Sequence, residues 1–141
     1  LHTGLGPEGV GERIFACRDD AAAFARAKRW WGEHITSIYD GSSNSPLLTG
    51  MMWLAAYDEC PQAEYTGIAL EYGTVPIMQS VQAMRADQWL EMHPETDAAV
   101  RDTIKRTMRD CFYIDTDDWK QRIVEQAFEA GHQALRGLSV R

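Results

Sequence analysis

The sequence predicts a small α/β fold, in which two or three sheet strands are flanked by about five helices. Residues 65–73 follow the two-residue period of a strand and place Ile68, Leu70 and Tyr72 on one face. Several longer segments repeat apolar residues with the period of an amphipathic helix. The chain has 141 residues, of which 45% are hydrophobic and 25% are charged, as is typical of a folded domain. We therefore expect residues 1–141 to form one domain.

The N-terminal third contains a glycine-rich segment, a short strand and a helix. Residues 1–11 hold four glycines and a proline, which predict an irregular loop. Residues 13–17 are predicted to form the short strand. One of two preceding aspartates is placed to cap a helix over residues 21–31, and Gly32 is placed to end it.

The middle of the chain is predicted to hold one helix between two loops. Residues 40–46 are polar and rich in turn formers, so they predict a loop. A helix is expected over residues 47–57, although Gly50 weakens its first turn. Residues 58–62 form the second loop and lead to the strand at 65–73.

The C-terminal half is predicted to be helical. Pro76 is placed at the start of a helix that continues to about Met92, and Pro94 ends it. A second helix is expected over residues 97–111. Thr116 begins a capping pattern, and the last helix is expected to run from Trp119 to Leu135.

Composition excludes several classes of function. The chain carries 14 Lys and Arg against 21 Asp and Glu, for a net charge of −7. Proteins that bind nucleic acids or membrane surfaces usually present a basic face, so we expect neither partner. No apolar run approaches the ~18 residues of a membrane span. The three cysteines lie far apart without metal-binding spacing, which favours reduced thiols and a cytoplasmic protein.

Glu71 is the first candidate catalytic residue. It lies near the carboxyl end of the predicted strand, on the face that also carries the small residues Ala69 and Gly73. An unpaired buried carboxylate is costly, and open α/β sheets bind ligands at the carboxyl ends of their strands. Gly73 is expected to let the backbone turn after the strand. The alternative is a solvent-facing Glu on a half-exposed strand.

His2 is the second candidate, because it precedes a flexible glycine turn and because neutral imidazole is the commonest metal ligand. A lone His is nevertheless more often a surface or structural residue. Glu129 and His132 lie on one helix face, as in di-iron bundles, but a single pair is more simply a solvated one. The glycine-rich segment does not match a phosphate-binding loop.

Several motifs together resemble a known family. Residues 2–7, His-Thr-Gly-Leu-Gly-Pro, closely resemble the signature of a bacterial family of unknown function. That family belongs to the zinc carboxypeptidase-like superfamily, near its succinylglutamate desuccinylase/aspartoacylase branch. Residues 70–75, Leu-Glu-Tyr-Gly-Thr-Val, resemble its Leu-Glu-Phe/Tyr-Gly-Thr motif. Residues 85–90, 109–113 and 134–138 resemble its later segments, so the resemblance spans essentially the whole chain in order.

The resemblance implies the C-terminal half of a zinc carboxypeptidase-like fold. By position, His2 resembles a zinc ligand, and Glu71 resembles the general base that activates zinc-bound water. That water would attack an amide in a small peptide or an N-acyl amino acid. The His-x-x-Glu ligand pair of the superfamily does not occur in this chain, although a catalytic zinc needs three protein ligands. We therefore expect the C-terminal portion of a larger catalytic domain, inactive as an isolated chain.

A non-enzymatic binding or assembly domain derived from the same fold is the alternative. A half-sheet would leave an unpaired edge and an exposed apolar face, so we expect a homo-oligomer. The metallohydrolase hypothesis predicts that Glu71 faces an open cleft at the carboxyl edge of the sheet, with His2 near it. The assembly hypothesis predicts a closed apolar interface in its place.

Overall fold

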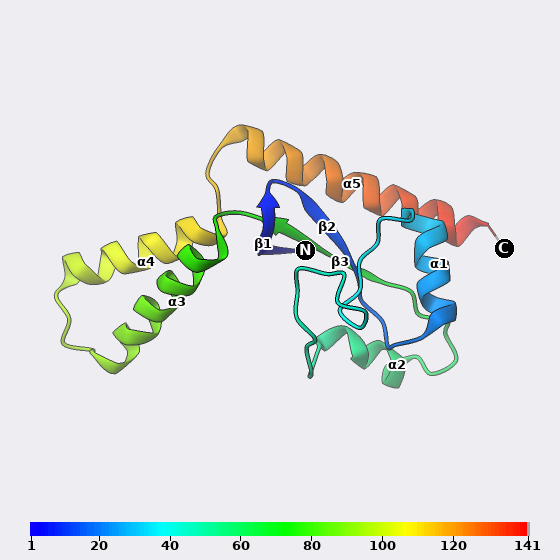
Figure 1. Cartoon of the computed structure of the whole chain (residues 1–141), viewed down its shortest axis with the longest axis horizontal. Coiled ribbons are helices and arrows are strands. Elements are labelled where there is room, and N and C mark those ends of the chain that lie inside the picture. The colour runs from blue at the N-terminus through cyan, green and yellow to red at the C-terminus, as the bar shows by residue number, and fades with distance from the viewer. Residues whose placement is uncertain (141) are drawn as a thin grey trace.

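The computed structural model describes residues 1–140 and shows a mixed α/β fold, as the sequence predicts. Three strands and five α-helices follow one another along the chain (Figure 1). They are β1 (His2–Glu8), β2 (Gly11–Phe15), α1 (Ala21–Trp31), a 3-10 turn (Met52–Leu54), α2 (Ala55–Glu59), β3 (Ile68–Gly73), α3 (Ile77–Met92), α4 (Ala98–Phe112) and α5 (Asp117–Ser139).

The three strands form one sheet with β3 in the centre, in the order β1-β3-β2. β1 runs parallel to β3, whereas β2 runs antiparallel to it. The register of β1 shifts between Thr3, which lies opposite Tyr72, and Glu8, which lies opposite Gly73. The four intervening residues of β1 therefore bulge out of the ladder beside the carboxyl end of β3.

Helices α1 and α5 cover the face of the sheet to which Leu70 and Tyr72 contribute. Both side chains belong to the main apolar cluster, which also contains Ala27 and Trp31 of α1 and Ala130 of α5. The indole of Trp31 donates a hydrogen bond to the carbonyl oxygen of Ala130, at 2.9 Å, so the two helices are also joined by a buried polar contact. The alternation predicted for this strand is thus confirmed on its core face.

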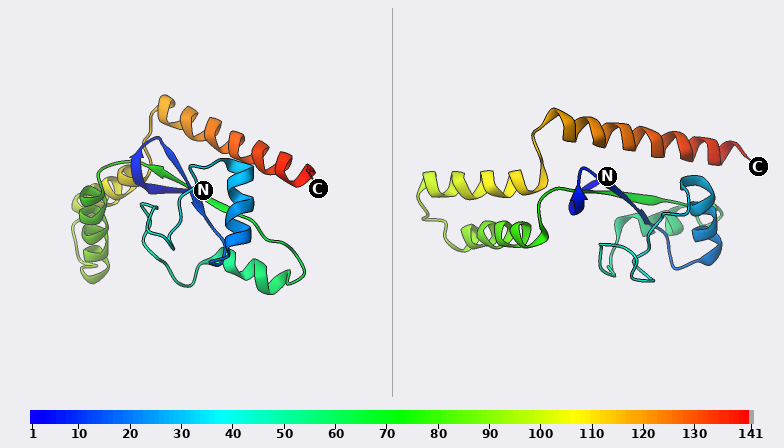
Figure 2. Two further views of the ribbon diagram at one scale, coloured as in Figure 1. Left: turned by 45° about the vertical axis from the view of Figure 1, so that its right-hand side comes forward. Right: turned by 45° about the horizontal axis from the view of Figure 1, so that its top comes forward.

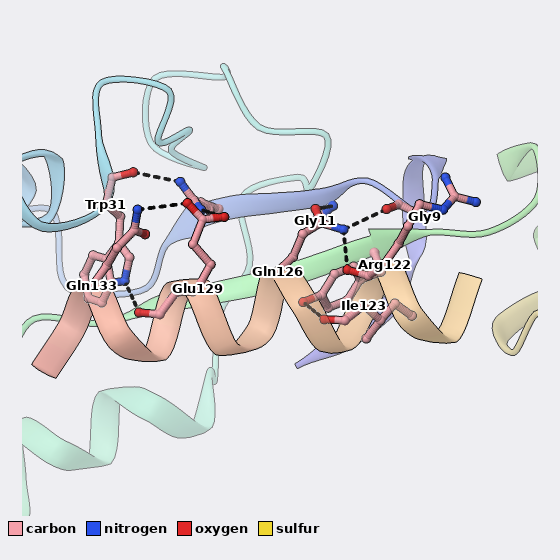
Figure 3. A network of polar contacts seen from close by, with 11 residues as sticks. Gly9, Gly11, Trp31, Arg122, Ile123, Gln126, Glu129 and Gln133 are labelled. Atoms are coloured by element: carbon pink, nitrogen blue, oxygen red, sulfur yellow. Dashed lines mark hydrogen bonds and ion pairs between the residues drawn. The ribbon is translucent and has the colours of Figure 1, made fainter. Parts of the chain in front are cut away.

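A polar network joins α5 to the turn between β1 and β2 (Figure 3). The Gln126 side chain accepts a hydrogen bond from the backbone N–H of Gly11 at 2.8 Å and donates one to the carbonyl oxygen of Gly9 at 2.9 Å. Arg122 donates to the carbonyl oxygen of Glu8 at 3.2 Å. A single helix therefore satisfies backbone groups of a glycine-rich turn that the sheet alone leaves unpaired.

Helices α3 and α4 pack on each other as a hairpin that extends away from the sheet (Figure 2). Its base is tied to the body by two threonine hydroxyls. Thr74 donates to the carbonyl oxygen of Cys111 and Thr3 to that of Phe112, both at 2.7 Å. These two bonds hold the end of α4 against β1 and against the segment that links β3 to α3.

Most helix boundaries match the sequence predictions. Asp20 caps α1 by accepting hydrogen bonds from the N–H groups of Ala22 and Ala23, and Gly32 follows that helix with a φ of 95°. Thr116 caps α5, which begins two residues earlier and ends four residues later than expected. Residues 1–140 contain three strands, which is the upper end of the predicted number.

Two local predictions are wrong. Residues 1–11 were expected to form an irregular loop, but they contain all of β1 and the first residue of β2. The glycines bring positive φ angles at the bulge and turn, while pairing with β3 keeps the backbone extended. The helix expected over residues 47–57 is restricted to the 3-10 turn and α2, because Gly50 has a φ of 71° that no helix accommodates.

Within residues 1–140, no helix is both long enough and apolar enough to cross a membrane.

Candidate functional site

Three titratable side chains, those of His2, Glu71 and Glu12, lie in one row across the sheet. Glu71 of β3 lies opposite His2 of β1 and also opposite Glu12 of β2. Residues paired across neighbouring strands share a face of the sheet, so the imidazole and the two carboxylates are on the same side, away from the core that Tyr72 helps to form. The register of the sheet therefore brings the two sequence-predicted site residues together, 69 positions apart in the chain.

Glu71 is buried, with only 9% of its surface exposed, so the solvent-facing alternative is wrong. One carboxylate oxygen accepts a hydrogen bond from the backbone N–H of Leu5 in the β1 bulge, at 3.2 Å. Burial raises the pKa of the Glu71 carboxyl above its ordinary value of 4.5. The Leu5 hydrogen bond and the charge of His2 act in the opposite direction, and the charge of Glu12 raises the pKa further. The main effect is that of burial, which disfavours the ionised form of Glu71 relative to a carboxyl group in water.

Gly73 is needed for close packing against β1 and not, as the sequence suggested, for a turn of the backbone. Its φ is not positive, so glycine is not required for a turn at that position. Instead, a Cβ on Gly73 would lie closer than 3.0 Å to the carbonyl oxygens of Gly6 and Pro7, a separation that real Cβ atoms do not show. The small residue therefore allows the β1 bulge to lie directly against β3 and to bring Leu5 to Glu71.

Glu12 is a site residue that the sequence analysis did not identify. Its carboxylate accepts hydrogen bonds from the Thr36 hydroxyl at 2.5 Å and from the Asn44 side-chain amide at 2.9 Å. Burial alone would raise the pKa of Glu12, but these hydrogen bonds together with that from Ser43 hold it below its ordinary value of 4.5. Glu12 therefore remains ionised and anchors the loop that contains Asn44. Only the register of β2 against β3 shows that it lies beside Glu71.

The metal-binding capacity of the site is incomplete. Within the part of the chain that the structure describes, no three His, Cys, Asp or Glu side chains are grouped so that they could hold a metal ion. His2 is exposed and has Glu71 as its nearest carboxylate across the ladder. A catalytic zinc needs three protein ligands, so His2 alone does not fit one.

The second candidate pair does not form a metal site either. The Glu129 carboxylate pairs with Arg13 at 3.3 Å and accepts a hydrogen bond from Gln133 at 3.2 Å (Figure 3). It is therefore occupied in attaching α5 to the sheet. His132 lies near Phe128 on the same helix, with ring centroids 6.3 Å apart. This agrees with the simpler reading of a helix-surface pair.

A cavity of about 520 Å³ lies beside the β1 bulge, and its wall includes Leu5 and Asn44, which donate hydrogen bonds to Glu71 and Glu12. Its wall consists of residues 4–8 of the β1 bulge, residues 74–77 at the start of α3, and Asn44. Glu71 does not line the cavity itself, but Leu5 both lines it and donates the hydrogen bond to Glu71. A larger hollow of about 600 Å³ lies on the other side of the sheet, where Leu70 and α5 line it. A third hollow of about 350 Å³ is lined by Glu12 and Asn44. The 520 Å³ cavity is the one connected to Glu71, through Leu5.

None of the curated proteins compared with this chain matches it, and none of the solved structures does. A family model, by contrast, covers residues 1–126 and so includes the whole sheet, the row of charged side chains and the cavity. The family is described as protein of unknown function (DUF2817). Because its model matches most of the chain, the protein belongs to this family.

Proposed function

We propose that this chain is the C-terminal, base-carrying portion of a zinc-dependent amide hydrolase, of the carboxypeptidase or N-acyl amino acid hydrolase type. The observation that carries the proposal is the placement of His2 directly opposite Glu71 on a neighbouring strand. A metal ligand and a general base have to be neighbours for the base to reach a metal-bound water. The two motifs that contain these residues are also those that resemble the zinc carboxypeptidase-like superfamily.

The environment of Glu71 suits a proton acceptor. The Leu5 N–H fixes one carboxylate oxygen, and within residues 1–140 the other oxygen accepts no hydrogen bond from the protein. A base works best when its pKa lies near the working pH, and burial raises the pKa of Glu71 in that direction. In the proposed role, Glu71 takes a proton from water and later passes it to the leaving amine.

The incomplete metal site sets a limit on the isolated chain. A catalytic zinc would polarise an amide carbonyl and lower the pKa of water, but residues 1–140 group no three candidate ligands. The proposal therefore requires further ligands from outside these residues. It also predicts that residues 1–141, produced alone, neither retain zinc nor hydrolyse amides.

Zinc content and hydrolysis of N-acyl amino acids, measured on the natural protein and on three variants, test the proposal. We expect Glu71→Gln to retain zinc and to lose hydrolysis by about 10²–10⁴-fold, the usual contribution of a general base. His2→Ala should lose zinc. Glu129→Gln, on the far side of the sheet, is the control and should retain both properties. Loss of zinc from Glu71→Gln would make Glu71 a ligand, and an active, zinc-loaded His2→Ala would refute the proposal.

A non-enzymatic assembly domain is the second candidate, and the surface of α5 favours it. Four apolar side chains form an exposed stripe on this helix: Val124, Phe128, Leu135 and Leu138, which are 50–65% exposed. In the described part of the chain the outer edge of β1 also has no strand partner. Burying such surfaces against a second copy would remove apolar area from water, so a homo-oligomer is part of this proposal.

Sedimentation at several concentrations separates the two candidates. An assembly domain should show a mass that rises with concentration, and Phe128→Asp should reduce it to that of a monomer. Thr103→Asp, at an exposed position on α4 and so away from the stripe, should leave the mass unchanged. A wild-type monomer at every concentration would refute the assembly proposal.

A further inference from the structure

The cavity beside the β1 bulge has an apolar wall. Two prolines, Pro7 and Pro76, have no backbone N–H to offer a ligand, and Leu5, Val75 and Ile77 contribute aliphatic side chains. Ile77 is 51% exposed, so its side chain is available at the mouth of the cavity. An occupant would therefore make mainly apolar contacts.

The two uncharged polar side chains of the wall, Thr74 and Asn44, already take part in hydrogen bonds. The Thr74 hydroxyl donates to the carbonyl oxygen of Cys111 at 2.7 Å. The Asn44 side-chain amide donates to Glu12 at 2.9 Å, and its backbone N–H donates to the same carboxylate at 3.1 Å. The Thr74 hydroxyl therefore retains no free donor, whereas the Asn44 amide retains one N–H beyond the one it gives to Glu12.

The charges around the cavity are unfavourable for an anion. No Lys, Arg or His lines it in the described part of the chain. Glu8 lies in its wall, and the nearby Arg122 is shared between Glu8, at 3.6 Å, and Asp118, at 2.9 Å. Free N–H groups at the start of α3 carry a partial positive charge, but the full charges of Glu8 and Glu12 oppose it.

We propose that this cavity receives an uncharged, apolar side chain or acyl group of the amide substrate and discriminates against an acidic one. The inference rests on the proposed function for the statement that the occupant is part of a substrate. It rests on the cavity wall alone for the chemistry of the occupant. Leu5 lies in the cavity wall and donates its N–H to Glu71, so one residue of the β1 bulge connects the cavity to that carboxylate.

Direct binding tests the chemistry of the occupant independently of catalysis. The probes are the N-acetyl amides of leucine, glutamate and lysine, which differ only in their side chains. Binding is followed by two-dimensional NMR at the amides of Leu5, Val75 and Ile77. We expect the leucine probe to bind about tenfold more tightly than the glutamate probe, because partial burial of one Leu side chain supplies enough binding free energy for that ratio. A glutamate or lysine probe that binds these residues as tightly as the leucine probe would overturn the proposal.

Matched variants at the start of α3 show whether the cavity causes the preference. Ile77→Lys should weaken the leucine probe and strengthen the glutamate probe, so that the preference falls by at least about tenfold. Met78→Lys adds the same charge one residue later, at an exposed side chain outside the cavity, and should leave the preference unchanged. Ile77→Gln removes the apolar contact without adding a charge. It replaces Ile77→Lys in the experiment if the lysine variant does not fold. Equal effects of the two lysine variants would refute a role for the cavity.

Hydrolysis by the natural protein then separates this inference from the proposed function. Faster hydrolysis of N-acyl leucine than of N-acyl glutamate supports both. Binding of the leucine probe without any amide hydrolysis overturns the proposed function and supports the apolar selectivity of the cavity. Hydrolysis that favours the glutamate substrate overturns the inference and leaves the proposed function in place.

Discussion

The contact between Gly73 and the β1 bulge is the feature on which both the sheet and the candidate site depend. Gly73 donates a hydrogen bond to the carbonyl oxygen of Val10 at 3.3 Å, and its own carbonyl oxygen accepts one from the N–H of Gly9 at 2.9 Å. The Trp119 indole donates to the same oxygen at 3.2 Å. We therefore expect Gly73→Ala to disturb the carboxyl end of β3 on several sides at once.

The expected magnitude follows from what the added methyl group would meet. Its closest neighbours would be the carbonyl oxygens of Gly6 and Pro7, both nearer than 3.0 Å. These are backbone atoms, so no side-chain rotation relieves the overlap and the bulge itself has to move. Inserting a methyl group into a well-packed region usually costs 1–3 kcal/mol, and the rigid neighbours place Gly73→Ala at about 3 kcal/mol. In a domain of this size, that corresponds to a fall in Tm of about 10 °C.

Urea denaturation of Gly73→Ala and Gly131→Ala provides the assay and its control. Gly131 lies in α5, where an added Cβ would meet no atom within 4 Å. Its replacement should stabilise the protein by about 1 kcal/mol, the difference in helix propensity between Ala and Gly. If the free energy of unfolding of Gly73→Ala lies within about 1 kcal/mol of the wild-type value, the close approach of the bulge to β3 is not a structural requirement.

Three further predictions concern Gln126, Glu12 and the thiols of Cys17 and Cys60. Gln126→Ala should lower the free energy of unfolding by about 1–3 kcal/mol, because two backbone groups of the β1–β2 turn lose their hydrogen-bond partner. The control, Gln121→Ala, should change the free energy of unfolding by less than about 0.5 kcal/mol. Equal losses for the two variants in urea denaturation would contradict this prediction. Because the folded-state pKa of Glu12 is lowered, its contribution to stability is present above its unfolded-state pKa and is lost as the pH falls through the folded value. Thermal unfolding of Glu12→Gln should therefore show a smaller loss of Tm between pH 7 and pH 3 than the wild type, and an unchanged pH dependence would refute the assignment. Finally, burial raises the pKa of the Cys17 thiol, so a thiol reagent should modify the exposed Cys60 at once and Cys17 only after unfolding, as mass spectrometry of the native protein can show.

Glu71 should respond to pH in the opposite sense to Glu12. Its folded-state pKa is raised, so the charged form is disfavoured by folding, and stability falls as the pH rises through that value. Glu71→Gln keeps the oxygen that accepts the Leu5 hydrogen bond and removes the buried charge. Thermal unfolding at pH 7 should accordingly show a Tm for Glu71→Gln no lower than that of the wild type. A large fall in Tm would indicate a structural role for the carboxylate.

The sequence by itself determined the central strand and four of the five α-helices of residues 1–140, namely α1, α3, α4 and α5. Caps such as Asp20 and Thr116 act through hydrogen bonds to backbone N–H groups two or three residues away, so they can be recognised locally. The alternation around Leu70 is likewise a local pattern, and it correctly placed Glu71 on the face opposite the core. The carboxylate and the imidazole were also recognised as candidates from their residue types and neighbours.

Only the tertiary structure decided what these residues face. The glycine-rich segment became β1 because β3 offered it a partner, and no periodicity within eleven residues encodes a partner that lies 65–69 positions away. The same pairing set His2 opposite Glu71, and the pairing of β2 added Glu12 to the row. Strand register depends on contacts between distant segments, whereas capping and alternation depend on neighbours in the chain, which is why the sequence identified the candidate residues but not their arrangement.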